Sequence, residues 1–367
     1  MCTGTWFSWS LREARMSRRA ERVAGKGNCF NRLRWIVALA IVSAMMFLAG
    51  SSFAQTLPYH LRQTGFRVLY IGPIFIAIEK GFFAQEGVDF GFTEIQSGGL
   101  GPATVLSGNA QLSDTDPITI AQLQAQGKRL KLVYNLVNRV TVEVVMRNEV
   151  IQKKGVSRFS SLKARYAAFK GLTIGITQPG ASGDVFARFF LIKAGLNPDR
   201  DANIIQVGGL GGMSAAFHSG RIDAFLQSPP LPQQLQRERV GQIIICNTCG
   251  DVPELRDATY VGIFTSTDYA ERNGGALRAY GRALRKATEW IRTNRAEALK
   301  ILGETYFKST SPESLADSLD ATMPAVSSDG RFTQAGIQNY LDVWKTVGLG
   351  VPANSAEGVL WTNEFAK

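Results

Sequence analysis

Histidine and cysteine are scarce in this chain of 367 residues, which contains only His60, His218 and four cysteines. Two histidines argue against a histidine-rich metal centre or a histidine-based catalytic relay, and four cysteines are too few for a disulfide scaffold. No collagen-like, coiled-coil or short-repeat periodicity is present. With 45% hydrophobic residues the chain is too apolar to be disordered, and its length suits two domains of ordinary size.

Acidic residues are outnumbered, but the excess of positive charge is unevenly distributed. The formal net charge is +11. Residues 1–54 hold eight Lys and Arg and two Glu, a net charge of +6, while the other residues hold 33 basic and 28 acidic side chains, a net charge of +5. Bulk charge therefore does not indicate a polyanion-binding stripe, and no nucleic-acid partner is predicted.

The basic N-terminal segment continues into an apolar run, Trp35–Gly50, which is followed by small residues at Ser52 and Ala54. This order is typical of a Sec-type secretory signal cleaved after Ala54. Residues 1–54 are therefore predicted to be a signal peptide, in which 1–15 could be a mis-assigned start because Met16 also fits. The run is short for a membrane span, which needs about 20 residues; a retained anchor is the alternative. The mature protein is expected in the periplasm.

Strand and helix patterns alternate along the mature chain. A strand is predicted over Tyr59–Gln63, with a break at Thr64–Gly65. A helix is predicted within Ile71–Phe83, and Gly81 is expected to end it. The alternation of strand and helix patterns begins again after Val140–Met146. From Ala276 onwards the pattern is that of helices alone. Such alternation predicts an α/β fold with two parallel-type sheets flanked by helices.

Four stretches then carry a family resemblance in the right order: Phe75–Asp89, Phe169–Ile176, Lys193–Asp199 and Ser219–Phe225, the last followed by Ser228-Pro229-Pro230. Together they resemble the solute-binding proteins of nitrate/sulfonate/taurine-type ABC transporters, which have the bilobed type II periplasmic-binding fold. One departure lies where the ligand should bind. The family's Gly-x-x-Asp motif is Gly108-Asn-Ala-Gln111 here, with Asp114 and Asp116 just beyond it.

The resemblance implies the domain organisation. Lobe 1 is expected to comprise 55–140 and 262–367, and lobe 2 residues 141–261. Val140–Met146 and Tyr260–Thr265 are expected to be the two crossover strands that form the hinge, with the C-terminal helices packed on lobe 1. The implied function is capture of a small organic molecule or anion between the lobes and delivery to an inner-membrane ABC permease. A monomer without cofactor, metal or enzymatic activity is expected. Nitrate, sulfonates, pyrimidines and aromatic acids all remain open as ligands.

Candidate ligand contacts lie where loops follow strands, because ligands of open parallel sheets bind beyond the carboxyl ends of the strands. Glycines there allow close approach of backbone, and helix N-termini offer free N–H groups. The Gln178–Gly183 turn favours an anionic group, with Ser182 as donor; an ordinary turn capped by Ser182 is the alternative. Asp116 could accept from a ligand amine, or belong to a plain Asp-Pro turn. The predicted ligand contacts are Gln63, Phe66, Ser97, Gly98, Asp116, Ser182, Gly183, Ser228 and Pro229.

Three further features receive structural interpretations. Cys246 and Cys249 are predicted to form a local disulfide without a catalytic task. Asp223 is expected to bind nearby backbone at a strand entry. Gly208–Gly212 lacks the spacing of a dinucleotide-binding loop. Two other functions stay open: a ligand-binding input for a membrane sensor, and an enzyme similar to the yeast-type thiamine-precursor synthases, whose cysteine-rich motif is absent here.

Overall fold

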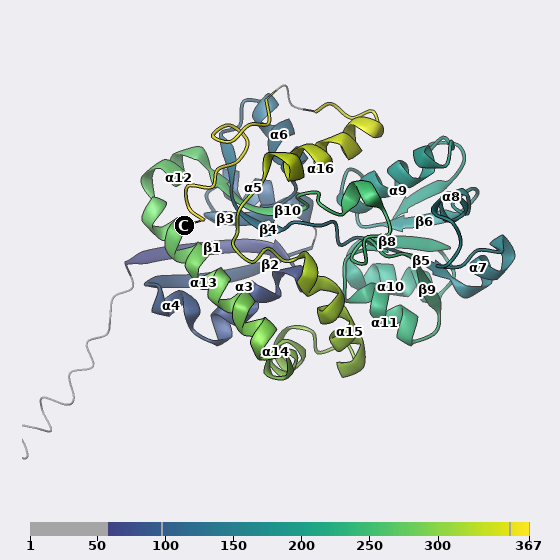
Figure 1. Ribbon diagram of the computed structural model, residues 1–367, viewed down its shortest axis with the longest axis horizontal. Helices are drawn as coiled ribbons and strands as arrows, with labels where there is room; N and C mark the ends of the chain where they lie inside the picture. The colour runs from purple at the N-terminus through teal and green to yellow at the C-terminus, as the bar shows by residue number, and fades with distance from the viewer. Residues whose placement is uncertain (1–57, 97, 352–353, 367) are drawn as a thin grey trace, which may run out of the picture. The chain divides into compact units, whose positions relative to one another are not determined.

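The computed structural model describes residues 58–96, 98–351 and 354–366, all of which belong to one unit of the chain. The predicted signal peptide, 1–54, lies outside the described residues. Within them the chain forms two five-stranded sheets with helices around each (Figure 1). The predicted α/β class with two sheets flanked by helices is confirmed.

The first sheet has the strand order β2-β1-β3-β10-β4. Its strands are β1 (Tyr59–Phe66), β2 (Val88–Ile95), β3 (Leu112–Thr115), β4 (Leu130–Val137) and β10 (Val261–Ser266). β1 pairs in parallel with both β2 and β3, whereas β10 is antiparallel to β3 and β4. β1 continues through Thr64–Gly65, where a break was predicted, because Thr64 and Gly65 pair with Thr93 and Glu94 of β2.

The second sheet repeats this plan, with the order β7-β6-β8-β5-β9. Its strands are β5 (Glu143–Arg147), β6 (Thr173–Ile176), β7 (Asn203–Gln206), β8 (Ala224–Gln227) and β9 (Gly241–Ile245). β6 is parallel to β7 and β8, and β5 is antiparallel to β8 and β9. All four residues of β8 are buried, as expected for a strand covered on both faces.

Both sheets are therefore mixed: each of the expected parallel-type sheets contains one antiparallel strand in addition to its parallel pairs. In each sheet the antiparallel strand is the one that the chain enters on arriving from the other sheet. Residues 138–142 lead from β4 into β5, and residues 246–260 lead from β9 back to β10. The alternation pattern could not reveal this, because strand direction depends on which sheet supplies the preceding element.

Helices cover both faces of the first sheet. Figure 1 shows α3, α4 and α13 on one side of it and α5 and α6 on the other. The predicted Ile71–Phe83 helix is divided at Gly81, whose φ of 67° is left-handed and suits glycine. The helices that precede the return strand here are α3 (Gly72–Glu79), α4 (Phe82–Gln85), α5 (Gly101–Leu106) and α6 (Pro117–Ala125).

The second sheet is covered in the same way. Figure 1 shows α8 and α9 on one side and α10 and α11 on the other. The helices of this part are α7 (Asn148–Lys154), α8 (Leu162–Ala167), α9 (Ser182–Lys193), α10 (Leu210–His218) and α11 (Leu231–Arg237). The buried face of α9 contributes Phe186, Phe189 and Phe190 to the core.

The C-terminal part is helical, as its periodicity predicts. Its helices are α12 (Thr267–Arg272), α13 (Gly274–Thr293), α14 (Arg295–Ile301), α15 (Pro312–Thr322) and α16 (Gln334–Thr346). α13 packs on α3 and α4 beside the first sheet, as expected. However, α16 contacts α9 as well as α6, and α15 contacts α11, so these helices touch elements of both sheets. Shorter helical turns are η2 (Leu69–Ile71), η3 (Gly98–Leu100), η4 (Pro253–Leu255), η5 (Leu302–Tyr306) and η6 (Met323–Ala325).

Candidate functional site

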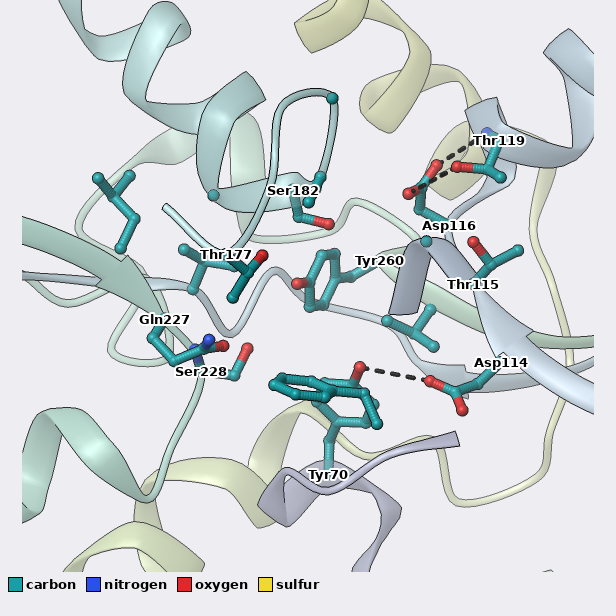
Figure 2. Close-up of a pocket in the computed structure, with 18 residues that line it drawn as sticks. Tyr70, Asp114, Thr115, Asp116, Thr119, Thr177, Ser182, Gln227, Ser228 and Tyr260 are labelled. Carbon is teal, nitrogen blue, oxygen red and sulfur yellow. Dashed lines mark hydrogen bonds between the residues drawn. The ribbon is translucent and has the colours of Figure 1, made fainter. Parts of the chain in front are cut away.

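Three strand ends, from both sheets, meet at one cavity of about 90 Å³ (Figure 2). β3 ends at Thr115 and is followed by Asp116, β6 is followed by Thr177, and β8 is followed by Ser228. The other parts of the wall come from Phe66, Tyr70 and Gly99 beside the first sheet and from the two connections between the sheets, through Val142 and Tyr260. The lining comprises Phe66, Tyr70, Gly99, Asp114, Thr115, Asp116, Thr119, Val142, Thr177, Gly180, Ala181, Ser182, Gly183, Leu226, Gln227, Ser228, Tyr260 and Val261.

The wall supplied by the first sheet carries two buried carboxyl groups. Asp114 is 1% exposed; its Oδ2 accepts a long hydrogen bond of 3.4 Å from the Tyr70 hydroxyl, and burial raises its pKa to about 7. Asp116 caps α6 by accepting from the Thr119 N–H at 2.9 Å and the Thr119 hydroxyl at 3.1 Å. Burial also raises the pKa of Asp116, to about 6. Ionisation of either acid therefore lowers the stability of the folded protein.

The wall supplied by the second sheet is a turn that leads into a helix N-terminus. The Gly180 N–H donates to Asp184 at 2.8 Å, which fixes the turn, and α9 begins at Ser182. A Cβ on Gly183 would lie 3.2 Å from the Leu226 carbonyl oxygen, so this glycine lets the helix approach β8 closely. This wall contributes the hydroxyl groups of Thr177, Ser182 and Ser228 and the positive N-terminal end of α9, a helix of 12 residues.

Tyr260 lies between the two walls in Figure 2, with Asp114, Asp116 and Tyr70 to one side and Thr177, Ser182 and Ser228 to the other. Its ring is 5% exposed and meets the Tyr70 ring edge-on, with a centroid distance of 6.1 Å. Burial raises the pKa of Tyr260 to about 12, although the hydroxyls of Ser182 and Ser228 oppose that shift. Tyr260 therefore stays neutral and joins the aromatic part of the cavity.

Five of the nine predicted contacts line this cavity: Phe66, Asp116, Ser182, Gly183 and Ser228. Gly98 begins η3, and its neighbour Gly99 is in the lining. Two others are placed elsewhere. Gln63 is 1% exposed and accepts from the Tyr280 hydroxyl at 2.6 Å, and the Pro229 carbonyl accepts from the Leu69 N–H at 3.0 Å. Ser97 lies outside the described residues.

Several lining residues were not among the predicted contacts, above all Asp114, Tyr70 and Tyr260. Asp114 was visible in the sequence as part of an acidic wall, but only its place near the end of a buried strand puts it at the cavity. Tyr260 ends the return connection and Val261 begins β10, which lies beside β3 although the two are far apart in sequence: Gly262 pairs with Thr115. Such a long-range pairing leaves no local signal.

A second, larger cavity of about 510 Å³ shares Phe66 with the first. The Gly208–Gly212 loop contributes here: α10 starts at Leu210, and both Leu210 and Gly211 line this cavity. Arg67 lines it too, but its guanidinium is paired with Glu94 and donates to the Tyr306 carbonyl oxygen at 3.1 Å. None of the residues Gly208–Gly212 lines the smaller cavity.

The structural interpretations given to other motifs can now be examined. Asp223 accepts from the Thr173 N–H at 2.8 Å, which confirms its role at a strand entry. Cys246 and Cys249 are joined by a disulfide, as predicted. Beside it, Glu143 of β5 accepts from the N–H groups of Asn247 at 3.0 Å and Thr248 at 3.3 Å, and from the Thr248 hydroxyl. Among the helices of the described residues, none is both long and apolar enough to span a membrane.

Comparison with known proteins supports the resemblance. The profile of the NMT1-like family matches residues 65–303. The chain is 20% identical over 254 residues to YtlA of Bacillus subtilis, named as a binding protein; the match covers 69% of this chain and 72% of YtlA. It is 26% identical over 260 residues to the nitrate/nitrite binding protein NrtA of Nostoc sp. PCC 7120, covering 64% of this chain and 55% of NrtA. The chain thus spans about half the length of this second relative.

Solved structures share the fold. A protein of Bordetella bronchiseptica RB50 matches with a TM-score of 0.73 and 24% identity, over 84% of this chain and 96% of that protein. The alkanesulfonate-binding protein SsuA of Xanthomonas axonopodis pv. citri, solved with MOPS, gives a TM-score of 0.64 and 18% identity, over 80% and 94% of the two chains. The periplasmic nitrate-binding protein NrtA of Synechocystis gives 0.59 and 20%, over 70% and 69%. The predicted periplasmic-binding fold is confirmed.

Proposed function

We propose that this chain, which belongs to the NMT1-like family, is an extracytoplasmic solute-binding protein that holds a small ligand between its two sheets and delivers it to an ABC permease. The observation that carries the proposal is the cavity at the strand ends. It is lined by polar groups from both sheets and by one residue from each connection between them, Val142 and Tyr260. A ligand that contacts all four parts would link the two sheets.

The relatives support a binding rather than a catalytic role. NrtA is named for nitrate and nitrite binding, and SsuA for alkanesulfonate binding. We therefore propose that this protein is not an enzyme, and that it works as a monomer in the periplasm after removal of residues 1–54. An ABC permease as the partner is also a proposal. This chain spans only about half of NrtA, so the partners of that protein do not transfer to it directly.

The mechanism follows from the connectivity. Only residues 138–142 and 246–260 join the strands of one sheet to those of the other before the C-terminal helices. We propose lobes with the predicted bounds, 55–140 with 262–367 and 141–261, which move about these connections. A ligand bound to one wall gains contacts with the other on closure. Its higher affinity for the closed form then shifts the population towards that form, which the permease would recognise.

The size of the cavity favours a ligand with few non-hydrogen atoms, since pockets for drug-sized molecules usually measure about 300–1,000 Å³. A panel of small cations, neutral molecules and oxyanions, tested by thermal unfolding, would examine the proposal. A compound at 100 times its Kd should stabilise the protein by about 2.7 kcal/mol. For a chain of this size each kcal/mol raises Tm by about 2–4 °C. Failure of every class of compound to raise Tm would contradict solute capture.

A further inference from the structure

The charge of the small cavity sets it apart from a site for an oxyanion. Among the described residues that line it, the charged side chains are Asp114 and Asp116, and none is Lys, Arg or His. The nearest arginine in sequence to a lining residue of the first sheet is Arg67, beside Phe66, and its charge is taken up by Glu94. The first wall is thus negative, without a compensating protein cation in the lining.

Among the described residues that line this cavity, Asp114 has a buried side-chain oxygen without a hydrogen-bond partner. The side chain is 1% exposed, and among the described residues no atom forms a hydrogen bond with its Oδ1. Its Oδ2 accepts the long hydrogen bond from Tyr70, and the backbone N–H of Asp114 itself also lowers the pKa of this carboxyl group. Asp116 differs, because each of its oxygens already accepts from Thr119. A buried carboxylate oxygen without a donor costs free energy. Oδ1 lies beside Gly65, whereas Tyr70, the partner of Oδ2, lines the cavity together with Asp114, so a donor in the cavity would approach the carboxyl group from the Oδ2 side.

The carboxyl group of Asp114 is also held in place by its surroundings. A Cβ on Gly65 would come within 2.5 Å of Oδ1, so the absence of a side chain at Gly65 makes room for this oxygen. Ser113, the preceding residue, donates to the Thr64 carbonyl oxygen at 2.9 Å and ties β3 to β1. The acceptor is therefore built on paired strands rather than on a loop.

Aromatic rings complete this end of the cavity. Phe66, Tyr70 and Tyr260 all line it, and the rings of Tyr70 and Tyr260 meet edge-on. The faces of such rings attract cations, most strongly where water is excluded. Aromatic rings beside a buried carboxylate favour a positively charged group and disfavour an anion, since like charges repel strongly in a medium of low dielectric constant.

We infer that the cavity binds a small organic cation, such as an amine or amidinium, which donates an N–H hydrogen bond to Asp114 from beside the rings of Phe66, Tyr70 and Tyr260. This inference rests on the proposed function and names the ligand class of that site. The cationic nitrogen lies towards the first sheet, because the N-terminus of α9 carries the positive end of its helix dipole. Any acceptor on the ligand faces the Ser182 end. The class differs from the nitrate for which NrtA is named.

Acetamidinium, acetamide, acetate and nitrate are suitable probes, because the first three have nearly the same shape and differ in charge. Binding is measured by calorimetry or NMR titration at pH 8, where Asp114 is ionised because its pKa is about 7. Wild-type protein should bind acetamidinium at least about tenfold more tightly than acetate or nitrate, a factor that corresponds to 1.4 kcal/mol. Acetamide should be intermediate.

Three variants locate the effect. Asp114→Asn should weaken acetamidinium binding at least about tenfold and leave acetamide within about twofold, since a hydrogen bond between charged groups is roughly twice as strong as one between neutral groups. Asp116→Asn should cause a smaller loss, because asparagine can cap α6 as aspartate does. Asp89→Asn, which neutralises an exposed acid paired with Arg62, should change nothing.

Two results would overturn the inference: tighter binding of acetate or nitrate than of acetamidinium, or equal affinity of wild type and Asp114→Asn for acetamidinium. Binding of no probe at all would also overturn it. The proposed function is judged separately by the larger panel. A neutral molecule or an oxyanion that stabilises the protein there leaves solute capture standing and removes only the ligand class.

Discussion

Two buried acids, one beside each sheet, show what distinguishes a structural carboxyl group from a functional one. Glu143 of β5 is 0% exposed and accepts from three donors of the disulfide loop, at Asn247 and Thr248. Asp114 of β3 is 1% exposed, yet Oδ1 has no partner among the described residues and Oδ2 has one long contact. Burial raises the pKa of both to about 7. Burial therefore disfavours the charged form at both sites, but Glu143 has protein donors whose hydrogen bonds depend on it, whereas Asp114 has few, which leaves room for a donor from a ligand.

The largest effect is expected at the partnered acid. Glu143→Ala should destabilise the protein by about 3 kcal/mol or more, because it leaves buried donors of Asn247 and Thr248 without an acceptor and opens a cavity. Urea unfolding at neutral pH measures this. Glu149→Ala, an exposed acid on the following helix whose side chain is 76% exposed, serves as the control and should change stability by no more than about 0.5 kcal/mol. A mild effect of Glu143→Ala would mean that its hydrogen bonds are not structural.

The opposite sign is expected at the cavity. Because the folded-state pKa of Asp114, about 7, exceeds the unfolded value of about 3.9, the folded state binds the proton more tightly. This acid therefore lowers stability progressively as pH rises from about 4 to 7, and the whole penalty is present above pH 7. The difference between these two pKa values, about three, corresponds to about 4 kcal/mol at pH 8, but asparagine remains a buried polar group, so Asp114→Asn should stabilise the unliganded protein by about 2 kcal/mol at pH 8 and by less at pH 5. The raised pKa of Asp116, about 6, gives a trend of the same sign that persists in the variant.

Urea unfolding of wild type and Asp114→Asn across this pH range provides the test. Destabilisation by Asp114→Asn at pH 8 would show that Asp114 is a structural acid like Glu143. The comparison between the two sites would then fail.

A smaller effect on stability, and none on binding, is expected at the disulfide beside Glu143. Replacing Cys246 and Cys249 together by serine removes a bridge that closes a loop of very few residues, so the loss should be no more than about 2 kcal/mol. Neither cysteine lines the cavity. Thiol counting after denaturation should find no free thiol in the exported wild-type protein, and the double variant should keep its ligand affinity. Loss of affinity would assign the loop a role in the site.

The sequence predicted those parts of the molecule that depend on local patterns. Val88–Ile95 was expected as a strand and is β2, and the turn before Ser182 leads into α9 as its glycines and proline suggested. Asp116 and Ser228 were predicted as contacts from the turns that follow two strands, and both line the cavity. These predictions needed only short-range periodicity and turn chemistry.

The remaining features depend on pairings that are distant in sequence. The antiparallel direction of β5 and β10 follows from the two crossings between sheets, which no local period encodes. Tyr260 lines the cavity because β10, which follows it, pairs with β3. Gln63 does not line it; its side chain accepts a hydrogen bond from the Tyr280 hydroxyl of α13 instead. Whether Asp114 or its neighbours carry the unpartnered oxygen is a matter of side-chain placement in three dimensions.

The most direct test of the account is one ligand's affinity measured in wild type and in one variant from each wall. Isothermal titration of the tightest compound from the panel would compare wild type with Asp114→Asn and Ser182→Ala; Ser161→Ala, which removes the N-cap of α8, is the control for loss of a hydroxyl. We predict at least about tenfold weaker binding for Asp114→Asn and about fivefold for Ser182→Ala, the latter equivalent to one hydrogen bond of about 1 kcal/mol. The control should match wild type. Unchanged affinity in either wall variant would contradict a ligand held between the two sheets.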